Sequence, residues 1–115
     1  MKDIDLLFAS SHSFKNFPLR VLYEKKSPRT SKVGVSILVS VPKKRFKKAT
    51  DRNRVKRLTR EAYRLNKSIL LPSQKEADYD LLVAFIYLGE EIFDFSILQQ
   101  KMQKALETLR EQVSE

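Results

Sequence analysis

The sequence predicts a single domain of the α+β class, and three observations lead to that prediction. Apolar residues recur at steps of three and four after Asp51, the spacing of one helix face, at Val55, Leu58, Ala62, Leu65 and Ile69. Between Val33 and Val41, apolar residues alternate with small or polar ones, a period of two that indicates a strand. With 115 residues the chain can build one hydrophobic core, so we expect one domain over residues 1–115.

The N-terminal part should contain a short helix and then a strand. Ile4, Leu7 and Phe8 have the spacing of a helix face, which predicts a short helix from Asp3 to about Ser10. Residues 19–24 are rich in β-formers, and the proline before them fits the start of a strand. We expect residues 25–31 to form a hairpin loop into the strand Val33–Val41.

The strand Val33–Val41 has two unlike faces. One carries valines and isoleucine and should face the core, whereas the other is small and partly polar, with Gly34, Ser36, Leu38 and Ser40. A face of small residues leaves room for something to lie against it, although plain exposure to solvent explains the pattern equally well.

The second half should contain two helices separated by a buried strand. The first helix is predicted from Arg52 to about Leu70, with Thr50 or Asp51 as its cap. A strand is predicted over residues 79–87, because residues 81–87 form a continuous apolar run, which is typical of a strand buried on both faces at the centre of a sheet. Ser96 and Gln99 suggest a capping box for a closing helix of about four turns, whose apolar stripe is Leu98, Met102, Ala105, Leu109 and Val113, with Leu106 at its edge.

The charge of the chain is concentrated in one stretch, residues 43–67. Twelve lysines and arginines stand there against two acids, a net charge of +10 in a chain whose total is +9. A local field of this size is typical of a surface that binds a polyanion. At 100° per residue, the face of the helix opposite the apolar stripe carries Asn53, Lys56, Arg57, Arg60, Arg64 and Lys67.

Other interpretations of the basic helix are less favourable. A helix whose charges only maintain solubility mixes signs at i, i+4 spacing, and only Arg57 with Glu61 clearly makes such a pair. A membrane-surface or calmodulin-target helix needs bulky aromatic residues on its apolar face, and this stripe is modest. A DNA-reading helix-turn-helix needs a short helix just before the basic one, where this chain has strands.

The residues of a protein catalyst are scarce. There is no cysteine, one histidine (His12) and no glycine-rich phosphate loop. Glu90, Glu91 and Asp94 fit a loop and helix cap better than a metal site. We therefore expect no catalytic residue and no cofactor bound by the polypeptide itself. No apolar run reaches the ~20 residues of a membrane span, and no signal peptide is recognisable, so a cytoplasmic protein is expected.

The run Arg52–Arg64, RNRVKRLTREAYR, resembles the signature helix of the protein subunit of bacterial ribonuclease P, and Ser40–Ala49 resembles the basic segment before it. The resemblance covers nearly the whole chain. It implies the order α-β-β-β-α-β-α, with a first strand near His12–Lys15, a four-stranded sheet packed against helices, and an unusual left-handed βαβ crossover, as in domain 2 of ribosomal protein S5.

The resemblance also implies function. Such proteins bind the catalytic RNA and the single-stranded 5′ leader of precursor tRNA, and the RNA subunit, which uses Mg²⁺, removes the leader as an endoribonuclease. The catalytic RNA would contact Lys43, Lys44, Arg45, Lys47, Lys48, Arg52, Asn53, Arg54, Lys56, Arg57, Arg60 and Arg64. The leader would lie in a cleft between the sheet and the first helix, lined by Phe8, Phe14, Phe17 and Tyr23, because stacking on aromatic rings tolerates any sequence. From the residues alone, core packing explains each aromatic as well, and a ribosomal or RNA-chaperone protein remains an alternative.

Overall fold

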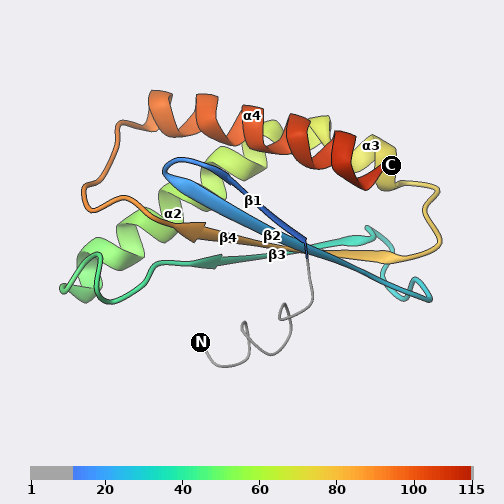
Figure 1. Ribbon diagram of the computed structural model, residues 1–115, viewed down its shortest axis with the longest axis horizontal. Coiled ribbons are helices and arrows are strands. Elements are labelled where there is room, and N and C mark those ends of the chain that lie inside the picture. Colours follow the sequence, from blue (N-terminus) through green and yellow to red (C-terminus); the bar gives the residue numbers. More distant parts are fainter. Residues whose placement is uncertain (1–11, 115) are drawn as a thin grey trace.

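The chain forms a four-stranded sheet with helices packed on one of its faces (Figure 1). The computed structural model describes residues 12–114. The helix expected at residues 3–10 therefore lies outside the described residues. The elements, in chain order, are β1 (His12–Asn16), β2 (Leu19–Lys26), β3 (Val35–Ser40), α2 (Ala49–Asn66), the 3₁₀ turn η1 (Lys67–Ile69), α3 (Leu71–Gln74), β4 (Asp80–Tyr87) and α4 (Phe95–Val113).

The strand β4 is central, as its apolar sequence predicted. The sheet order is β1-β2-β4-β3, with β4 antiparallel to β2 and parallel to β3. Leu81, Val83, Phe85 and Tyr87 are buried on the helix side of the strand, and Ala84 is buried on the other side. The predicted first strand is also confirmed, since β1 pairs antiparallel with β2.

The expected hairpin between β2 and β3 is wrong, because β4 lies between these two strands. A strand that is apolar on both faces buries most surface in the middle of a sheet, so β4 displaces β3 from β2. The connection from β2 to β3 is held to β4 at Asp80, whose carboxylate accepts hydrogen bonds from Thr30 Oγ1 (2.7 Å) and from the backbone N–H of Thr30 (3.0 Å).

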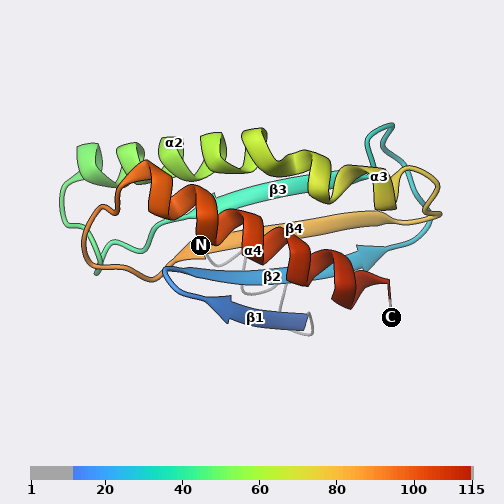
Figure 2. The same ribbon diagram turned by 90° about the horizontal axis from the view of Figure 1, so that it is seen from above.

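The crossover from β3 through α2 to β4 is left-handed, as the resemblance implied. In Figure 2 both strands run from right to left, α2 lies on the viewer's side of the sheet and runs back to the right, and β4 lies below β3. Rotating the view until the strands point upward places β4 to the left of β3. Most parallel strand pairs are joined with the opposite hand.

The core lies between the sheet and the helices α2 and α4. The whole predicted stripe of α4 is buried, including Leu106, which is fully buried and not at the edge. The capping box is wrong: α4 begins at Phe95, its N-cap is Asp94 without a side-chain cap, and Ser96 lies inside the helix. Its 19 residues form about five turns.

Candidate nucleic-acid interface

The buried face of α2 decides which of its basic residues point outward. Val55, Thr59 and Ala62 are buried, whereas Leu65, expected in the stripe, is 46% exposed. At 100° per residue Thr59 lies 40° to one side of Val55 and Leu65 lies about 80° to the other, so the inward face is centred near Val55 and Ala62. Thr59 can be buried because its hydroxyl donates to the carbonyl of Val55 at 2.8 Å.

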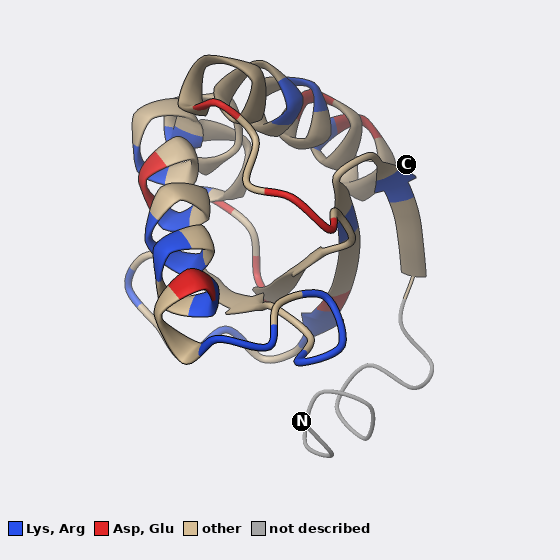
Figure 3. Cartoon of the chain, turned by 90° about the vertical axis from the view of Figure 1, so that its left-hand side faces the viewer, with Lys and Arg blue, Asp and Glu red and all other residues tan. Residues whose placement is uncertain are grey.

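The outward face of α2 is a row of cations. Figure 3 looks at the end of the molecule where α2 begins and shows Lys and Arg along this helix and in the loop leading into it. Asn53, Arg54, Arg57, Arg60, Arg64 and Lys67 are exposed, and Lys56 is half-buried. The structure thus confirms the solvent side for the predicted face residues except Lys56, which is partly covered, and adds Arg54 to them.

Few of these charges are paired with an acid within residues 12–114. The expected pair of Arg57 with Glu61 is wrong, because Glu61 instead accepts from Arg64 Nε at 3.1 and 3.0 Å. These hydrogen bonds, followed by the charge of Arg64, lower the pKa of Glu61. Arg57 and Arg60 make no ion pair with any residue between 12 and 114.

The basic loop, residues 43–48, is anchored at two points. Phe46 is buried and packs against Tyr87, with 5.9 Å between ring centroids. Arg52 Nη1 donates to the carbonyls of Phe46 and Lys47, each at 2.9 Å. The expected cap by Thr50 or Asp51 is wrong, because α2 begins at Ala49 and its N-cap, Lys48, has no side-chain cap. The hydrogen bonds from Arg52 hold the start of the helix to the loop instead.

The lysines of the basic loop point to solvent, while its arginine is engaged. Lys43, Lys44, Lys47 and Lys48 are exposed. Arg45 forms an ion pair with Glu90, 3.3 Å between Nη1 and Oε1, so one of its donors holds the loop to the segment after β4. Arg45 and Arg52, both expected to contact RNA, thus also position the loop.

Of the expected cleft aromatics that the structure describes, Phe14 and Tyr23 lie near each other, whereas the ring of Phe17 meets that of Phe93. Phe8 lies outside the described residues. Tyr23 does not lie on the small-residue face of the sheet, because the register places it opposite Val83, on the side covered by α2 and α4. Tyr23 is only 5% exposed, and its hydroxyl donates to Gln112 Oε1 of α4 at 2.9 Å.

The remaining two aromatics differ in exposure. Phe14 is half-buried and packs against the core, with its ring 6.5 Å from that of Tyr23. Phe17, in the turn between β1 and β2, is 57% exposed. On the opposite face of the sheet from α2 and α4, where room for a ligand was expected, Leu38 is 40% exposed. A cleft between that face and the first helix stays a prediction.

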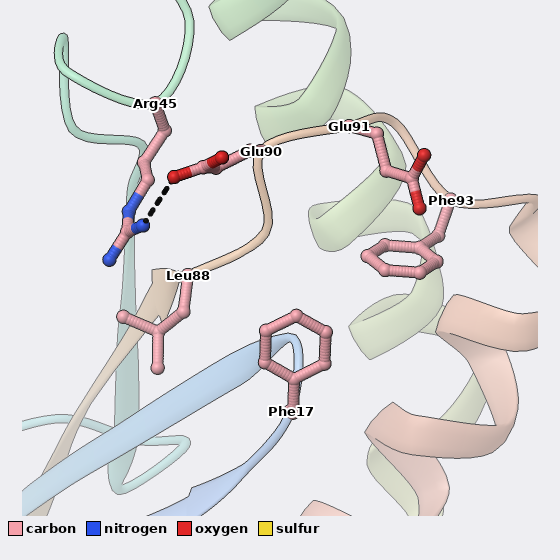
Figure 4. A pocket seen from close by; sticks show the side chains of 6 residues that line it. All are labelled: Phe17, Arg45, Leu88, Glu90, Glu91 and Phe93. Carbon is pink, nitrogen blue, oxygen red and sulfur yellow. Dashed lines mark hydrogen bonds and ion pairs between the residues drawn. The ribbon is translucent and has the colours of Figure 1, made fainter.

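A pocket that the sequence did not reveal opens beside the basic loop (Figure 4). It is lined by Phe17, Arg45, Leu88, Glu90, Glu91 and Phe93, and its volume is about 560 Å³. The sequence predicts a loop at Glu90 and Glu91, but no sequence signal joins them to Phe17, which lies far away in the chain.

The loop that carries Glu91 and Phe93 is shaped by one buried tyrosine. The hydroxyl of Tyr87 donates to the carbonyl of Glu91 at 2.8 Å and accepts from the N–H of Phe93 at 3.3 Å. Burial raises the pKa of Tyr87, so the hydroxyl stays protonated and keeps its donor. Tyr87 therefore holds in place the loop that forms one wall of the pocket.

Side chains that could bind a metal ion do not cluster in the part of the chain that the structure describes. Over residues 12–114, no three His, Cys, Asp or Glu side chains gather where they could hold a metal ion. His12 stacks on Tyr23, with 5.3 Å between ring centroids and 29° between ring planes. In the same part of the chain, no helix is both long enough and apolar enough to cross a membrane. What the described residues do present is a cationic surface on α2 and the basic loop.

Known proteins share both the sequence and the fold. The family model described as Ribonuclease P matches residues 1–110. A ribonuclease P protein component from Porphyromonas gingivalis (strain ATCC 33277) is 43% identical over 104 residues, which cover 90% of this chain and 75% of that protein. One from Chlorobaculum tepidum is 36% identical over 90 residues, covering 73% of this chain and 58% of that protein.

Two solved structures extend the likeness to the fold. The ribonuclease P protein of Thermotoga maritima superposes with a TM-score of 0.71 at 27% identity, covering 93% of this chain and 91% of that one. That of Staphylococcus aureus gives 0.68 at 21% identity, covering 95% and 90%, and shows the fold alone. The chain therefore belongs to the ribonuclease P protein family, the protein components of a tRNA-processing endoribonuclease that is a ribonucleoprotein and whose RNA is their partner.

Proposed function

We propose that this protein binds the catalytic RNA of ribonuclease P through the outward face of α2 and the basic loop, and that it holds the single-stranded 5′ leader of precursor tRNA for removal. The observation that carries the proposal is the row of exposed cations on α2, of which Arg57 and Arg60 have no acidic partner among residues 12–114. Cations held outward without partners are available to phosphate oxygens.

The shape of this surface suits an RNA backbone. Lys56 to Lys67 spans roughly 16 Å of helix at 1.5 Å per residue, and the four exposed lysines of the basic loop extend the strip beyond the start of α2. Arginines on a rigid helix offer planar forks to paired phosphate oxygens, while the loop lysines act as flexible point charges. The helix would therefore give the contact its geometry, and the loop would add attraction.

The leader is best contacted by an aromatic ring that is exposed to solvent. A single strand is held by stacking its bases on aromatic faces next to a cationic groove. Among the expected cleft residues that the structure describes, Phe17 has the most exposed ring, and it lies at the end of the sheet where the basic loop begins. We assign the leader contact to this end and do not assign it to the buried Tyr23.

The chemistry is assigned to the RNA. Mg²⁺ would act on the RNA subunit, and the protein's side chains would attract, orient and retain the two RNAs without taking part in hydrolysis. Precursor tRNA is thus the substrate of the assembled particle, and the cytoplasm, where tRNA matures in bacteria, is its place of action.

The test is reconstitution with the cognate catalytic RNA. At low Mg²⁺ we expect no cleavage of a precursor tRNA by the protein alone, weak cleavage by the RNA alone, and restored 5′ cleavage by both together. Cleavage by RNA-free, heat-renatured protein would overturn the assignment of chemistry to the RNA. A protein that leaves the cleavage rate of the RNA unchanged would overturn the proposal as a whole.

A further inference from the structure

The pocket in Figure 4 has an apolar interior built from two aromatic rings and a leucine. Phe17 and Phe93 meet edge to face, with 5.8 Å between centroids and 89° between planes. Leu88 closes the side nearer the sheet. Because Phe17 is 57% exposed, part of its ring is open to the pocket and to solvent. A flat ring could stack there.

The rim of this pocket carries both signs of charge. Glu90, whose side chain is 80% exposed, reaches Arg45 across the mouth at 3.3 Å. Glu91 is exposed, and its carboxylate has no hydrogen-bond partner within residues 12–114. The Nε of Arg45 is buried and also lacks a partner there. The pocket thus presents acceptors at its mouth beside a guanidinium with donors to spare.

This arrangement disfavours binding of a phosphate group inside the pocket and favours binding of a nucleobase. Two carboxylates repel phosphate oxygens, whereas they accept hydrogen bonds from amino groups. The basic loop next to the pocket attracts the backbone on either side. A single-stranded RNA satisfies both conditions when one base turns inward and its phosphates stay on the lysines.

We propose that the pocket formed by Phe17, Leu88, Phe93 and the carboxylates of Glu90 and Glu91 binds one unstacked nucleobase of single-stranded RNA and favours bases with an exocyclic amino group. This inference rests on the proposed function for its RNA, which is either the leader of precursor tRNA or an unpaired nucleotide of the catalytic RNA. Cytosine, adenine and guanine each offer amino hydrogens to a carboxylate. Uracil offers one N–H between two carbonyl oxygens, which a carboxylate repels.

The experiment compares variants of one exposed side chain in the reconstituted holoenzyme. Phe17→Ala removes the stacking surface, Phe17→Trp keeps it, and Val33→Ala is the matched control. Val33 is 58% exposed, and it lies before the start of β3, at the opposite end of the sheet. Affinity is measured for leaderless precursor, for precursors with leaders of increasing length, and for the same leaders with uridine placed at one position at a time.

If the base belongs to the leader, Phe17→Ala should weaken binding of leader-bearing substrate by at least about fivefold, the lower end of one lost stack. Leaderless substrate should be unaffected, and Phe17→Trp should behave as wild type. Uridine at one leader position should weaken wild-type binding, and this penalty should disappear in Phe17→Ala and shrink in Glu91→Gln. If the base belongs to the catalytic RNA, Phe17→Ala should instead weaken assembly of the particle by a similar factor.

Two results would overturn the inference. Phe17→Ala that matches Val33→Ala in both assembly and substrate binding would show that no base stacks there. The amino-group preference would be refuted if Phe17→Ala weakened binding of leader-bearing substrate and left assembly unchanged, while uridine at no leader position weakened wild-type binding. Failure of the proposed leader contact looks different, because the wild-type holoenzyme itself would then bind leaderless and leader-bearing substrates equally.

Discussion

Replacing Arg60 by alanine should reduce the salt dependence of binding to the catalytic RNA. Arg60 lies on the outward face of α2, is exposed and makes no ion pair with residues 12–114. Alanine is the best helix former, so the helix itself should be unharmed. The perturbation therefore removes one cation from the proposed interface and little else.

The size of the effect follows from counterion release. Each phosphate contact contributes about 0.7 to 0.9 to the slope of log K against log salt. Raising salt from about 50 to about 200 mM is a fourfold change, over which one contact is worth roughly a threefold change in affinity. Arg60→Ala should thus lose about three times more affinity, relative to wild type, at the lower salt than at the higher.

The assay is equilibrium binding of the protein to the catalytic RNA over a salt series. Arg60→Lys should keep the slope, because the charge remains, but lose affinity if the planar fork matters. Lys104→Ala removes the same charge from the exposed side of α4, which is outside the proposed interface, and should leave the slope close to that of wild type. Equal slopes for Arg60→Ala and wild type would refute the assignment of this helix face to RNA.

Three further predictions concern the scaffold that positions these surfaces. Tyr87→Phe leaves the two backbone groups of the loop after β4 without their partner, so it should cost about 1–3 kcal/mol in chemical denaturation and weaken any base binding that Phe17→Ala weakens. Asp80→Asn should lower the free energy of unfolding at neutral pH, because hydrogen bonds from Thr30 depress the pKa of the Asp80 carboxyl in the folded protein. The stability that the carboxylate adds is present above the ordinary aspartate pKa of about 4 and is lost as pH falls through the lower folded pKa. A stability difference between variant and wild type that persists unchanged at pH 2 would contradict this. Leu106→Ala should cost about 2–5 kcal/mol, whereas Leu65→Ala, 46% exposed, should cost far less; equal costs in urea denaturation would contradict the burial pattern.

Sequence signals for helix starts were less reliable than those for helix faces. Thr50 and Asp51 are ordinary capping residues, yet α2 begins before them, and Ser96 lies inside α4. The start of α2 is held by the hydrogen bonds from Arg52 to the basic loop and by the burial of Phe46. Local capping preference is worth about 1 kcal/mol, which tertiary anchoring of the preceding loop can exceed.

The amino-acid pattern by itself determined what depends on a single element. The separation of charge from apolar surface on α2, the apolar character of β4 on both faces and the stripe of α4 follow from the sequence, because periods of 3.6 and 2 fix the side on which each residue lies. The basic run also carried the family resemblance that the comparisons bear out.

Only the tertiary structure decided which elements are neighbours. The position of β4 between β2 and β3, the burial of Tyr23 under α4 and the partner of Glu61 all depend on choices among several possible contacts. The meeting of Phe17 with Phe93 is the clearest case, because it needs the β1–β2 turn and the loop after β4 to lie at the same end of the strands. Periodicity specifies a face but not what packs against it, and that is settled by the burial of the whole core at once.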